Sequence, residues 1–201
     1  GIAHYDSPDE RGIDVALLFN RNRFKPISSK AYPLYLKREN GEIDYTRDHL
    51  LVSGYLDNEL VHFIVNHWPS RSGGQMRSEP SRILAGKLNK KIIDSIISKD
   101  SHAKIINMGD FNDNPSDQAQ KFERAGCEWI HIVDLNGAFA GRPINEEPVD
   151  EILKSVTIPI QLGGGIRDIE TIENWIKKGV SRIILGTIAL RDPSFVITAA
   201  K

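Results

Sequence analysis

The sequence has 201 residues, of which 40% are hydrophobic and 26% charged, a composition typical of a soluble globular chain of one or two domains and unlike a disordered one. Its 26 Lys and Arg residues nearly balance its 27 Asp and Glu residues, so net charge gives no support for bulk attraction to nucleic acid or to an anionic membrane. No apolar run approaches the ~20 residues that a membrane span needs, so no membrane partner is expected.

Two features bear on the compartment. The opening segment, Gly1 to Glu10, is polar and acidic, which predicts that the chain as given carries no signal peptide. The single cysteine, Cys127, excludes an internal disulfide and a cysteine-based zinc cluster. Both features favour a reducing, cytoplasmic environment.

The first third of the chain is predicted to form strands separated by polar loops. Residues 13–19 are a largely apolar run suited to a buried strand, and residues 24–36 contain shorter extended stretches. The runs 49–55 and 60–65 flank Asp57 and Asn58, whose residue types favour a tight turn. We therefore expect an antiparallel hairpin at these two runs.

A helix is expected after the Gly/Ser-rich loop at residues 70–74. Pro80 can open it, and an apolar stripe recurs every four residues along it, at Leu84, Leu88, Ile92 and Ile96. Residues 103–108 then have the apolar character of another strand.

Strands and helices alternate through the rest of the chain. The expected strands are 129–135, 158–162 and 182–185. Helix-start signals stand at Asn114-Pro115, Asn145, Asp168 and Asp192-Pro193. Such alternation implies parallel strands joined by right-handed βα connections. Counting 103–108, this section supplies four strands and four helices, which is half of an eight-stranded βα barrel.

Four motifs in the first part of the chain resemble those of a known family. They are Arg11-Gly-Ile-Asp-Val-Ala-Leu-Leu18, Thr46-Arg-Asp-His-Leu50, Asn66-His-Trp-Pro-Ser-Arg71 and Gly109-Asp-Phe-Asn-Asp113. Through them, residues 1–117 resemble the endonuclease/exonuclease/phosphatase family, the deoxyribonuclease-like, metal-dependent hydrolases.

This resemblance implies hydrolysis of a phosphodiester or a phosphate-containing small molecule, assisted by a divalent ion, usually Mg²⁺. It implies that His67 contacts the scissile phosphate and that Asp110 orients or deprotonates the attacking water. Asn112 would hydrogen-bond the phosphate or position Asp110. Arg71 and Arg11 are weaker candidates for phosphate contacts, and the metal ligands are unknown.

The family pattern is only partly present. Members carry an early strand that ends in Asn, a metal-ligating Glu, and a closing Ser-Asp-His motif. Here Ser-Asp occurs only at Ser116-Asp117, where Gln118 follows, so about half of the catalytic set has no counterpart in these residues. Both motifs also have interpretations in which their residues have no catalytic role. Gly109–Asp113 can be an ordinary turn, and His67 can simply end an edge strand.

The second part of the chain resembles a different family. The matching stretches are residues 122–138, Gln161-Leu-Gly-Gly-Gly-Ile-Arg167 and Ile184-Leu-Gly-Thr187. Residues 118–201 resemble the N-terminal half of the histidine-biosynthesis isomerase that rearranges a phosphoribosylformimino-aminoimidazole-carboxamide ribotide, a βα barrel. In that family, loops after the third and fourth strands hold a substrate phosphate with backbone N–H groups and a helix N-terminus. The residues that match this role are Gly165, Arg167, Gly186 and Thr187.

The two resemblances meet at residues 105–110, a strand that ends in an aspartate where the barrel needs its first strand and first catalytic Asp. We therefore expect an α/β fold: a partial α+β hydrolase-like sheet in residues 1–102, then a (βα)₄ half-barrel in residues 103–201, with the strand segment 103–117 contributed by the hydrolase-like part. In this arrangement Asp110 lies at the mouth beside Asp134 and the loop 163–165. The alternatives are that Asp134 caps a loop and that the glycines tighten a turn.

Three functions from different classes follow. The favoured one is a composite of two truncated enzymes without complete catalytic activity, which retains at most weak divalent-metal or phosphate binding, because each mechanism lacks groups that it requires. The others are a Mg²⁺-dependent phosphodiesterase that uses His67, Asp110 and Asn112, and a half-barrel ribotide isomerase that is active only on association. A half-barrel leaves two sheet edges and an apolar face uncovered, which predicts self-association.

Overall fold

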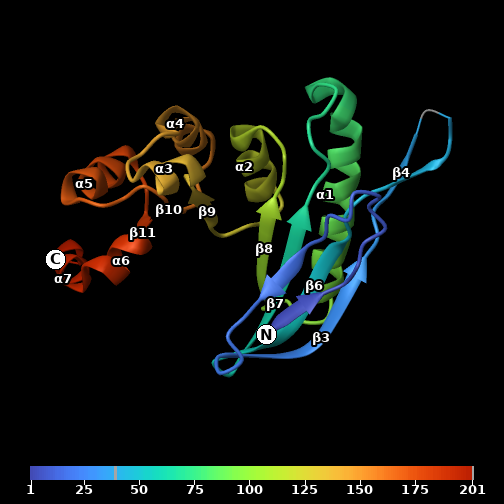
Figure 1. Cartoon of the computed structure of the whole chain (residues 1–201), viewed down its shortest axis with the longest axis horizontal. Helices are drawn as coiled ribbons and strands as arrows, with labels where there is room; N and C mark the ends of the chain where they lie inside the picture. The colour runs from blue at the N-terminus through green and yellow to red at the C-terminus, as the bar shows by residue number, and fades with distance from the viewer. Residues whose placement is uncertain (39, 201) are drawn as a thin grey trace. The chain divides into compact units, whose positions relative to one another are not determined.

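The structure is a computed structural model that describes residues 1–38 and 40–200 (Figure 1). The chain divides by its internal contacts into two compact units, Gly1–Asp113 and Asn114–Lys201. Lys201, the last residue of the expected second segment, lies outside the described residues. Across the described ranges, no helix has both the length and the apolar character that crossing a membrane requires.

The first unit contains a four-stranded sheet, one long helix and two short two-stranded ribbons. Its elements are β1 (Ile2–His4), β2 (Ala16–Leu18), β3 (Phe24–Tyr32), β4 (Tyr35–Lys37), β5 (Ile43–Tyr45), β6 (His49–Leu56), β7 (Glu59–His67), α1 (Gln75–Ile97) and β8 (Lys104–Asp110).

The expected hairpin is confirmed as β6 and β7. Leu56 pairs with Glu59, and both intervening residues, Asp57 and Asn58, have positive φ, 48° and 73°, as a two-residue type I′ turn requires. The β3 strand pairs antiparallel with β6, and β8 pairs parallel with β7. The resulting sheet order is β3-β6-β7-β8.

Both faces of this sheet are covered. Helix α1 packs Ile92 and Ile96 against Ile64 of β7 on one face. The β1–β2 ribbon packs Leu17 against a cluster that includes Phe24 and Val52. The α1 helix begins at Gln75 rather than at Pro80, which lies inside it. A proline in the second turn removes one backbone hydrogen bond, and the turn before it is closed by Ser78, whose N–H and Oγ both donate to the Gly74 carbonyl.

The second unit has three strands with helices between them. Its elements are α2 (Pro115–Arg124), β9 (Ile130–Val133), α3 (Leu135–Ala140), α4 (Glu146–Ser155), β10 (Ile160–Gly163), α5 (Ile169–Lys178), β11 (Arg182–Ile184), α6 (Thr187–Arg191) and α7 (Pro193–Ala199). The sheet order is β11-β10-β9 with both pairs parallel, which confirms the parallel βα arrangement for these strands. Its core includes Leu162 of β10 packed with Trp175 of α5.

The structure places the expected first strand of the half-barrel in the sheet of the first unit. Strand β8 completes the first unit's sheet, where it pairs with β7 from Val61↔Lys104 to His67↔Asp110. Ile105 also packs into the α1 cluster, so both the backbone and a side chain of β8 are engaged in the first unit. Within the part of the chain that the structure describes, the second sheet therefore has three strands, not four, and no closed barrel is present.

Candidate functional site

The candidate site of the first unit lies where β7 and β8 end side by side. The parallel register places His67 opposite Asp110, and the N–H of Trp68 donates to the Asp110 carbonyl oxygen at 2.9 Å. Gly109 makes this approach feasible, because its φ is +139° and a Cβ there would lie 1.9 Å from the Asn66 carbonyl oxygen. The fold thus brings together two residues that are 43 positions apart in the sequence.

The loop after β8 is tied back to β7. The backbone N–H of Asn112 donates to Oδ1 of Asp110 at 2.9 Å, and Nδ2 of Asn112 donates to the Trp68 carbonyl oxygen at 3.0 Å. The Phe111 ring packs edge-on against Trp68, with 5.0 Å between ring centroids. Asn112 therefore holds the Asp110 carboxylate and anchors the loop.

The same loop is fixed from the other side by α1. Arg82, which is buried, places Nε 3.4 Å from Oδ1 of Asp113, and Nε2 of Gln75 donates to the same oxygen at 3.3 Å. Nη1 of Arg82 donates to the Ser78 hydroxyl at 2.7 Å. The first turns of α1 thus position the segment that follows Asp110.

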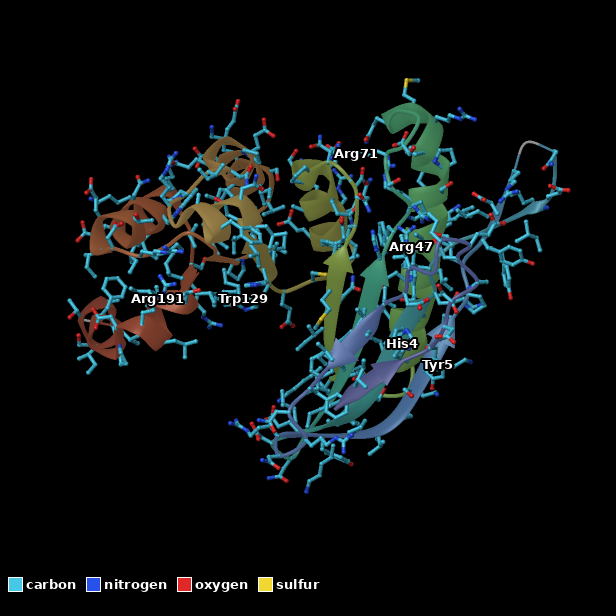
Figure 2. All side chains as sticks on the ribbon, in the orientation of Figure 1. His4, Tyr5, Arg47, Arg71, Trp129 and Arg191 are labelled. Atoms are coloured by element: carbon cyan, nitrogen blue, oxygen red, sulfur yellow. The ribbon has the colours of Figure 1, made fainter. Side chains whose placement is uncertain are left out.

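A buried arginine, Arg47, stands at the centre of the site and was missed as a candidate from the sequence (Figure 2). Its side chain is 3% exposed; Nη2 donates to the Trp68 carbonyl oxygen at 2.8 Å, and Nη1 lies 3.3 Å from Oδ2 of Asp9. Asp9 also accepts two hydrogen bonds from the exposed Arg11, at 2.9 and 2.7 Å. Its place in the Thr46–Leu50 motif could have identified Arg47 as a site residue from the sequence. No sequence pattern could have identified Asp9, because it lies in an irregular loop.

These charges act on one another. The hydrogen bonds from Arg11, and then that from Arg47, hold the pKa of Asp9 well below its usual range. Burial lowers the pKa of His67; the charge of Arg47 lowers it further, while Asp110 opposes the change. At neutral pH the site therefore presents the neutral imidazole of His67, the ionised carboxylate of Asp9 and the guanidinium groups of Arg11 and Arg47.

Arg71 lies apart from these contacts. It is exposed in the loop between β7 and α1, four residues beyond His67, and its carbonyl oxygen accepts a hydrogen bond from the Gly74 N–H at 3.0 Å (Figure 2).

The second unit gathers its expected phosphate-binding residues at the carboxyl ends of β10 and β11. These strands pair Gly163 with Ile184, so the loop with Gly165 and the Gly186–Thr187 step follow neighbouring strands. Gly165 has a φ of +74°, and a Cβ there would lie 2.6 Å from the Arg142 carbonyl oxygen. Arg167 directs Nη2 to the Ala138 carbonyl oxygen at 3.3 Å.

Asp134 is engaged in local structure. It is 4% exposed and accepts hydrogen bonds from the N–H groups of Gly137, Ile144 and Asn145 at 2.8, 2.8 and 3.1 Å, and from the Asn145 side chain at 2.6 Å. The interpretation of Asp134 as a loop cap therefore fits the structure, and its oxygens face these donors rather than a substrate space.

Asp110 supplies the carboxylate at the His67–Asp110 edge that could ligate a divalent ion. Mg²⁺ takes an octahedral set of oxygen ligands, several of them water, and Oδ1 of Asp110 also accepts the Asn112 N–H. In residues 1–38 and 40–200, the one group of three His, Cys, Asp or Glu residues whose ligand atoms all lie within 4.8 Å of one another is His4, Asp6 and Asp14, which excludes Asp110.

Comparison with known families agrees with both resemblances. Residues 1–127 match the Endonuclease/Exonuclease/phosphatase family, and because this is more than half of the chain, the chain belongs to that family. Residues 103–201 match the family described as Histidine biosynthesis protein. The two matches overlap over residues 103–127, which include β8 and α2.

The chain is also similar to curated enzymes over part of its length. A 1-(5-phosphoribosyl)-5-((5-phosphoribosylamino)methylideneamino) imidazole-4-carboxamide isomerase from Rhodospirillum rubrum is 63% identical over 91 residues, 45% of this chain and 38% of that protein. The isomerase 2 of the same name from a Ruegeria species is 60% identical over 91 residues, with the same coverage. The Azorhizobium caulinodans enzyme is 52% identical over 116 residues, 55% of this chain and 48% of that protein. The chain thus spans less than half the length of these relatives.

Proposed function

We propose that this chain is a composite of two partial enzymes whose first unit binds a phosphate ester at the carboxyl ends of β7 and β8, without a complete catalytic centre in either unit. The observation that carries the proposal is the in-register pair His67 and Asp110 beside the buried Arg47. Membership of a phosphoester-hydrolase family supports the choice of ligand.

The groups divide by charge. The neutral His67 imidazole can donate a hydrogen bond to a phosphate oxygen, and the exposed Arg11 guanidinium can neutralise it. Arg47 stays behind them, with two of its nitrogens directed to Trp68 and Asp9, and contributes its positive field. Asp110 can orient a water on the other side of the phosphate. In the residues that the structure describes, Asp110 belongs to no group of three metal-ligating side chains, and we therefore propose binding rather than efficient hydrolysis.

The test measures binding and turnover on the same protein. Inorganic phosphate is titrated by calorimetry into the native chain and into His67→Gln, Arg167→Gln and, as a matched control, the exposed His102→Gln. We expect His67→Gln to weaken the binding by about tenfold, consistent with the loss of one hydrogen bond to a charged group, and His102→Gln to leave it unchanged. Binding unchanged in His67→Gln refutes the proposed site, and loss in Arg167→Gln alone places the phosphate in the second unit.

The alternative is a Mg²⁺-dependent phosphodiesterase, which the position of Asp110 beside His67 favours. Hydrolysis of bis(p-nitrophenyl) phosphate by the chain is measured once with Mg²⁺ and once with EDTA. Under the composite proposal, the rate in both conditions equals the rate in buffer without protein. Turnover that needs Mg²⁺ and disappears in Asp110→Asn establishes the alternative instead.

For the second unit we propose weak phosphate binding at Gly165, Arg167, Gly186 and Thr187, and self-association through its sheet. Strands β9 and β11 have one neighbour each, and the residues at and after the end of β9 include exposed apolar side chains, Val133, Leu135 and Phe139. Open strand edges and exposed apolar side chains promote association. Sedimentation velocity over a concentration series is expected to give a dimer or larger species, and a monomer at every concentration contradicts this.

A half-barrel ribotide isomerase is the second alternative, favoured by the identity to the isomerases over residues in this unit. It expects metal-independent turnover of the ribotide by the associated species. The composite proposal expects none, because Asp110, the aspartate expected at the barrel's first catalytic position, ends a strand of the first unit's sheet.

A further inference from the structure

Asp9 is a buried carboxylate beside the arginines of the candidate phosphate site. Its side chain is 2% exposed, and the hydrogen bonds from Arg11, and then that from Arg47, hold its pKa well below its usual range. Asp9 is therefore an anion at neutral pH. Such a carboxylate repels phosphate, so its charge by itself can only weaken the binding of that ligand.

Asp9 fixes both the backbone and the guanidinium of Arg11. Nε of Arg11 donates to Oδ1 of Asp9 at 2.9 Å and Nη2 donates to Oδ2 at 2.7 Å, which is the two-pronged geometry of an arginine on a carboxylate. The Arg11 backbone N–H also donates to Oδ1, at 3.0 Å. The turn is closed by Gly12, whose N–H donates to the Asp9 carbonyl oxygen at 2.9 Å and whose φ is +66°. Arg11 is thus held in one orientation, although its side chain is 58% exposed.

A chain of contacts joins this turn to the end of β7. Nη1 of Arg47 lies 3.3 Å from Oδ2 of Asp9, and Nη2 of Arg47 donates to the Trp68 carbonyl oxygen at 2.8 Å. The Trp68 N–H in turn donates to the Asp110 carbonyl oxygen at 2.9 Å. Asp9 therefore connects the turn to the candidate site through Arg47, a side chain that is only 3% exposed.

We propose that Asp9 is a positioning residue of the phosphate site, which holds the Arg11 guanidinium where it can meet a phosphate oxygen. This inference rests on the proposed function of that site. A free arginine side chain has many rotamers, and a guanidinium that is already fixed does not lose this freedom when the ligand binds. Nη1 of Arg11 takes no part in the two-pronged contact with Asp9 and can donate to the ligand.

The alternative role of Asp9 is purely structural. Arg47 is buried, and a buried charge without a counter-charge is costly, so Asp9 would serve only to neutralise it. The two roles differ in the sign of one effect. If Asp9 is only a counter-charge, its replacement by a neutral side chain removes a repulsion and phosphate binds more tightly. If Asp9 positions Arg11, phosphate binds more weakly in spite of the lost repulsion.

The test is a double-mutant cycle of phosphate binding in the full chain. Inorganic phosphate is titrated by calorimetry at pH 7.5 into the native chain, Asp9→Asn, Arg11→Gln and the double variant. Asp9→Asn keeps the volume of the side chain but places an –NH₂ group where one carboxylate oxygen accepted from an arginine, and so breaks the two-pronged contact. We expect Arg11→Gln to weaken binding about tenfold, consistent with the loss of one hydrogen bond to a charged group.

The effect of Asp9→Asn should differ in sign between the two backgrounds. Loss of the repulsion strengthens binding about threefold, whereas release of Arg11 weakens it about tenfold. We therefore expect Asp9→Asn to bind phosphate about threefold more weakly than the native chain, and the double variant to bind it about threefold more tightly than Arg11→Gln. Tighter binding by Asp9→Asn than by the native chain, or the same effect in both backgrounds, overturns the proposal.

A second measurement tests the fixation of Arg11 without phosphate. The ¹⁵N relaxation of Nε of Arg11 is compared with that of the exposed Arg21, in the native chain and in Asp9→Asn. We expect Nε of Arg11 to be as rigid as the backbone in the native chain and as mobile as that of Arg21 in Asp9→Asn. Unchanged amide shifts of β7 and β8 show that the variant folds. If Nε of Arg11 is as mobile as that of Arg21 in the native chain itself, the proposal is overturned.

Asp57→Asn is the matched control. Asp57 makes the same two-pronged contact with Arg23 in the turn before β7, whereas His67 ends that strand. Its substitution should leave both the phosphate affinity and the relaxation of Arg11 unchanged; an equal loss of affinity there overturns the proposal. Phosphate binding that is absent from the native chain, or unchanged in His67→Gln, refutes the proposed function and this inference with it. Binding that His67→Gln weakens but Asp9→Asn strengthens refutes the role of Asp9 alone.

Discussion

His49 should make the stability of the first unit strongly dependent on pH. Its side chain is 1% exposed, neither ring nitrogen has a hydrogen-bond partner, and the ring stacks on Trp68 with 6.5 Å between centroids and 7° between planes. Burial lowers the pKa of His49 from 6.5 to about 4. In the unfolded chain the same ring binds a proton near its ordinary pKa, so protons favour the unfolded state below that pH.

The magnitude follows from this difference. The contribution of neutral His49 is fully present above pH 6.5 and is lost as the pH falls toward 4. At about 1.4 kcal/mol per pH unit the full loss is about 3 kcal/mol, of which about 2 kcal/mol is lost between pH 7.5 and pH 5. His62 and His67, whose pKa values burial also lowers, add to the dependence in the same direction.

A substitution isolates the part due to His49. His49→Leu removes the titrating group at similar volume without orphaning a partner. Urea unfolding is followed at pH 7.5 and pH 5 through NMR signals of β6 and β7, which report on the first unit alone. The native chain is expected to lose about 2 kcal/mol more than His49→Leu between the two pH values. His102→Gln, the exposed control, should keep the native dependence. If His49→Leu shows the same pH dependence as the native chain, the burial argument is wrong.

Three further changes test other parts of the structure. Gly109→Ala should lower the free energy of unfolding of the first unit by about 3 kcal/mol, because Gly109 has a positive φ and a Cβ there would clash with Asn66. The control Gly41→Ala, at a position with a positive φ but open space, should lower it by only about 1 kcal/mol in the same urea titration. Ile92→Ala, at a side chain that is almost wholly buried, should lose about 3 kcal/mol in urea unfolding and the exposed Ile97→Ala less than about 0.5 kcal/mol; equal losses would contradict the α1 packing. Asp134→Ala should destabilise the second unit by about 3 kcal/mol and make trypsin cleave the folded variant faster within that unit. The control Asp168→Ala removes one cap hydrogen bond, to the Thr171 N–H, and should cost about 1 kcal/mol. Cleavage of Asp134→Ala no faster than that of the native chain would refute the role of Asp134 as a loop cap.

The sequence predicted those features that depend on a few neighbouring residues. The β6–β7 hairpin follows from Asp57 and Asn58, whose side chains tolerate positive φ, and the parallel strands of the second unit follow from caps and glycines at helix ends. The motifs around His67 and Asp110 identified the family, because residue types and their order can be recognised in the sequence without any knowledge of contacts.

Other features depended on partners distant in the sequence. Arg47 and Asp9 became site residues only through contacts with Trp68 and Arg11, and Asp134 proved to be a cap only once its four donors were located. The segment 103–127 matches both families, so its residues were compatible with either sheet. Its β8 strand joined β7 because a seven-residue ladder and the α1 cluster engage it there. By itself, then, the sequence determined the β6–β7 turn, the alternation of strands and helices in the second unit and the two family resemblances. Tertiary structure decided which strand β8 pairs with and which charges meet, because strand pairing and charge burial are set by the sum of many long-range contacts rather than by any local pattern.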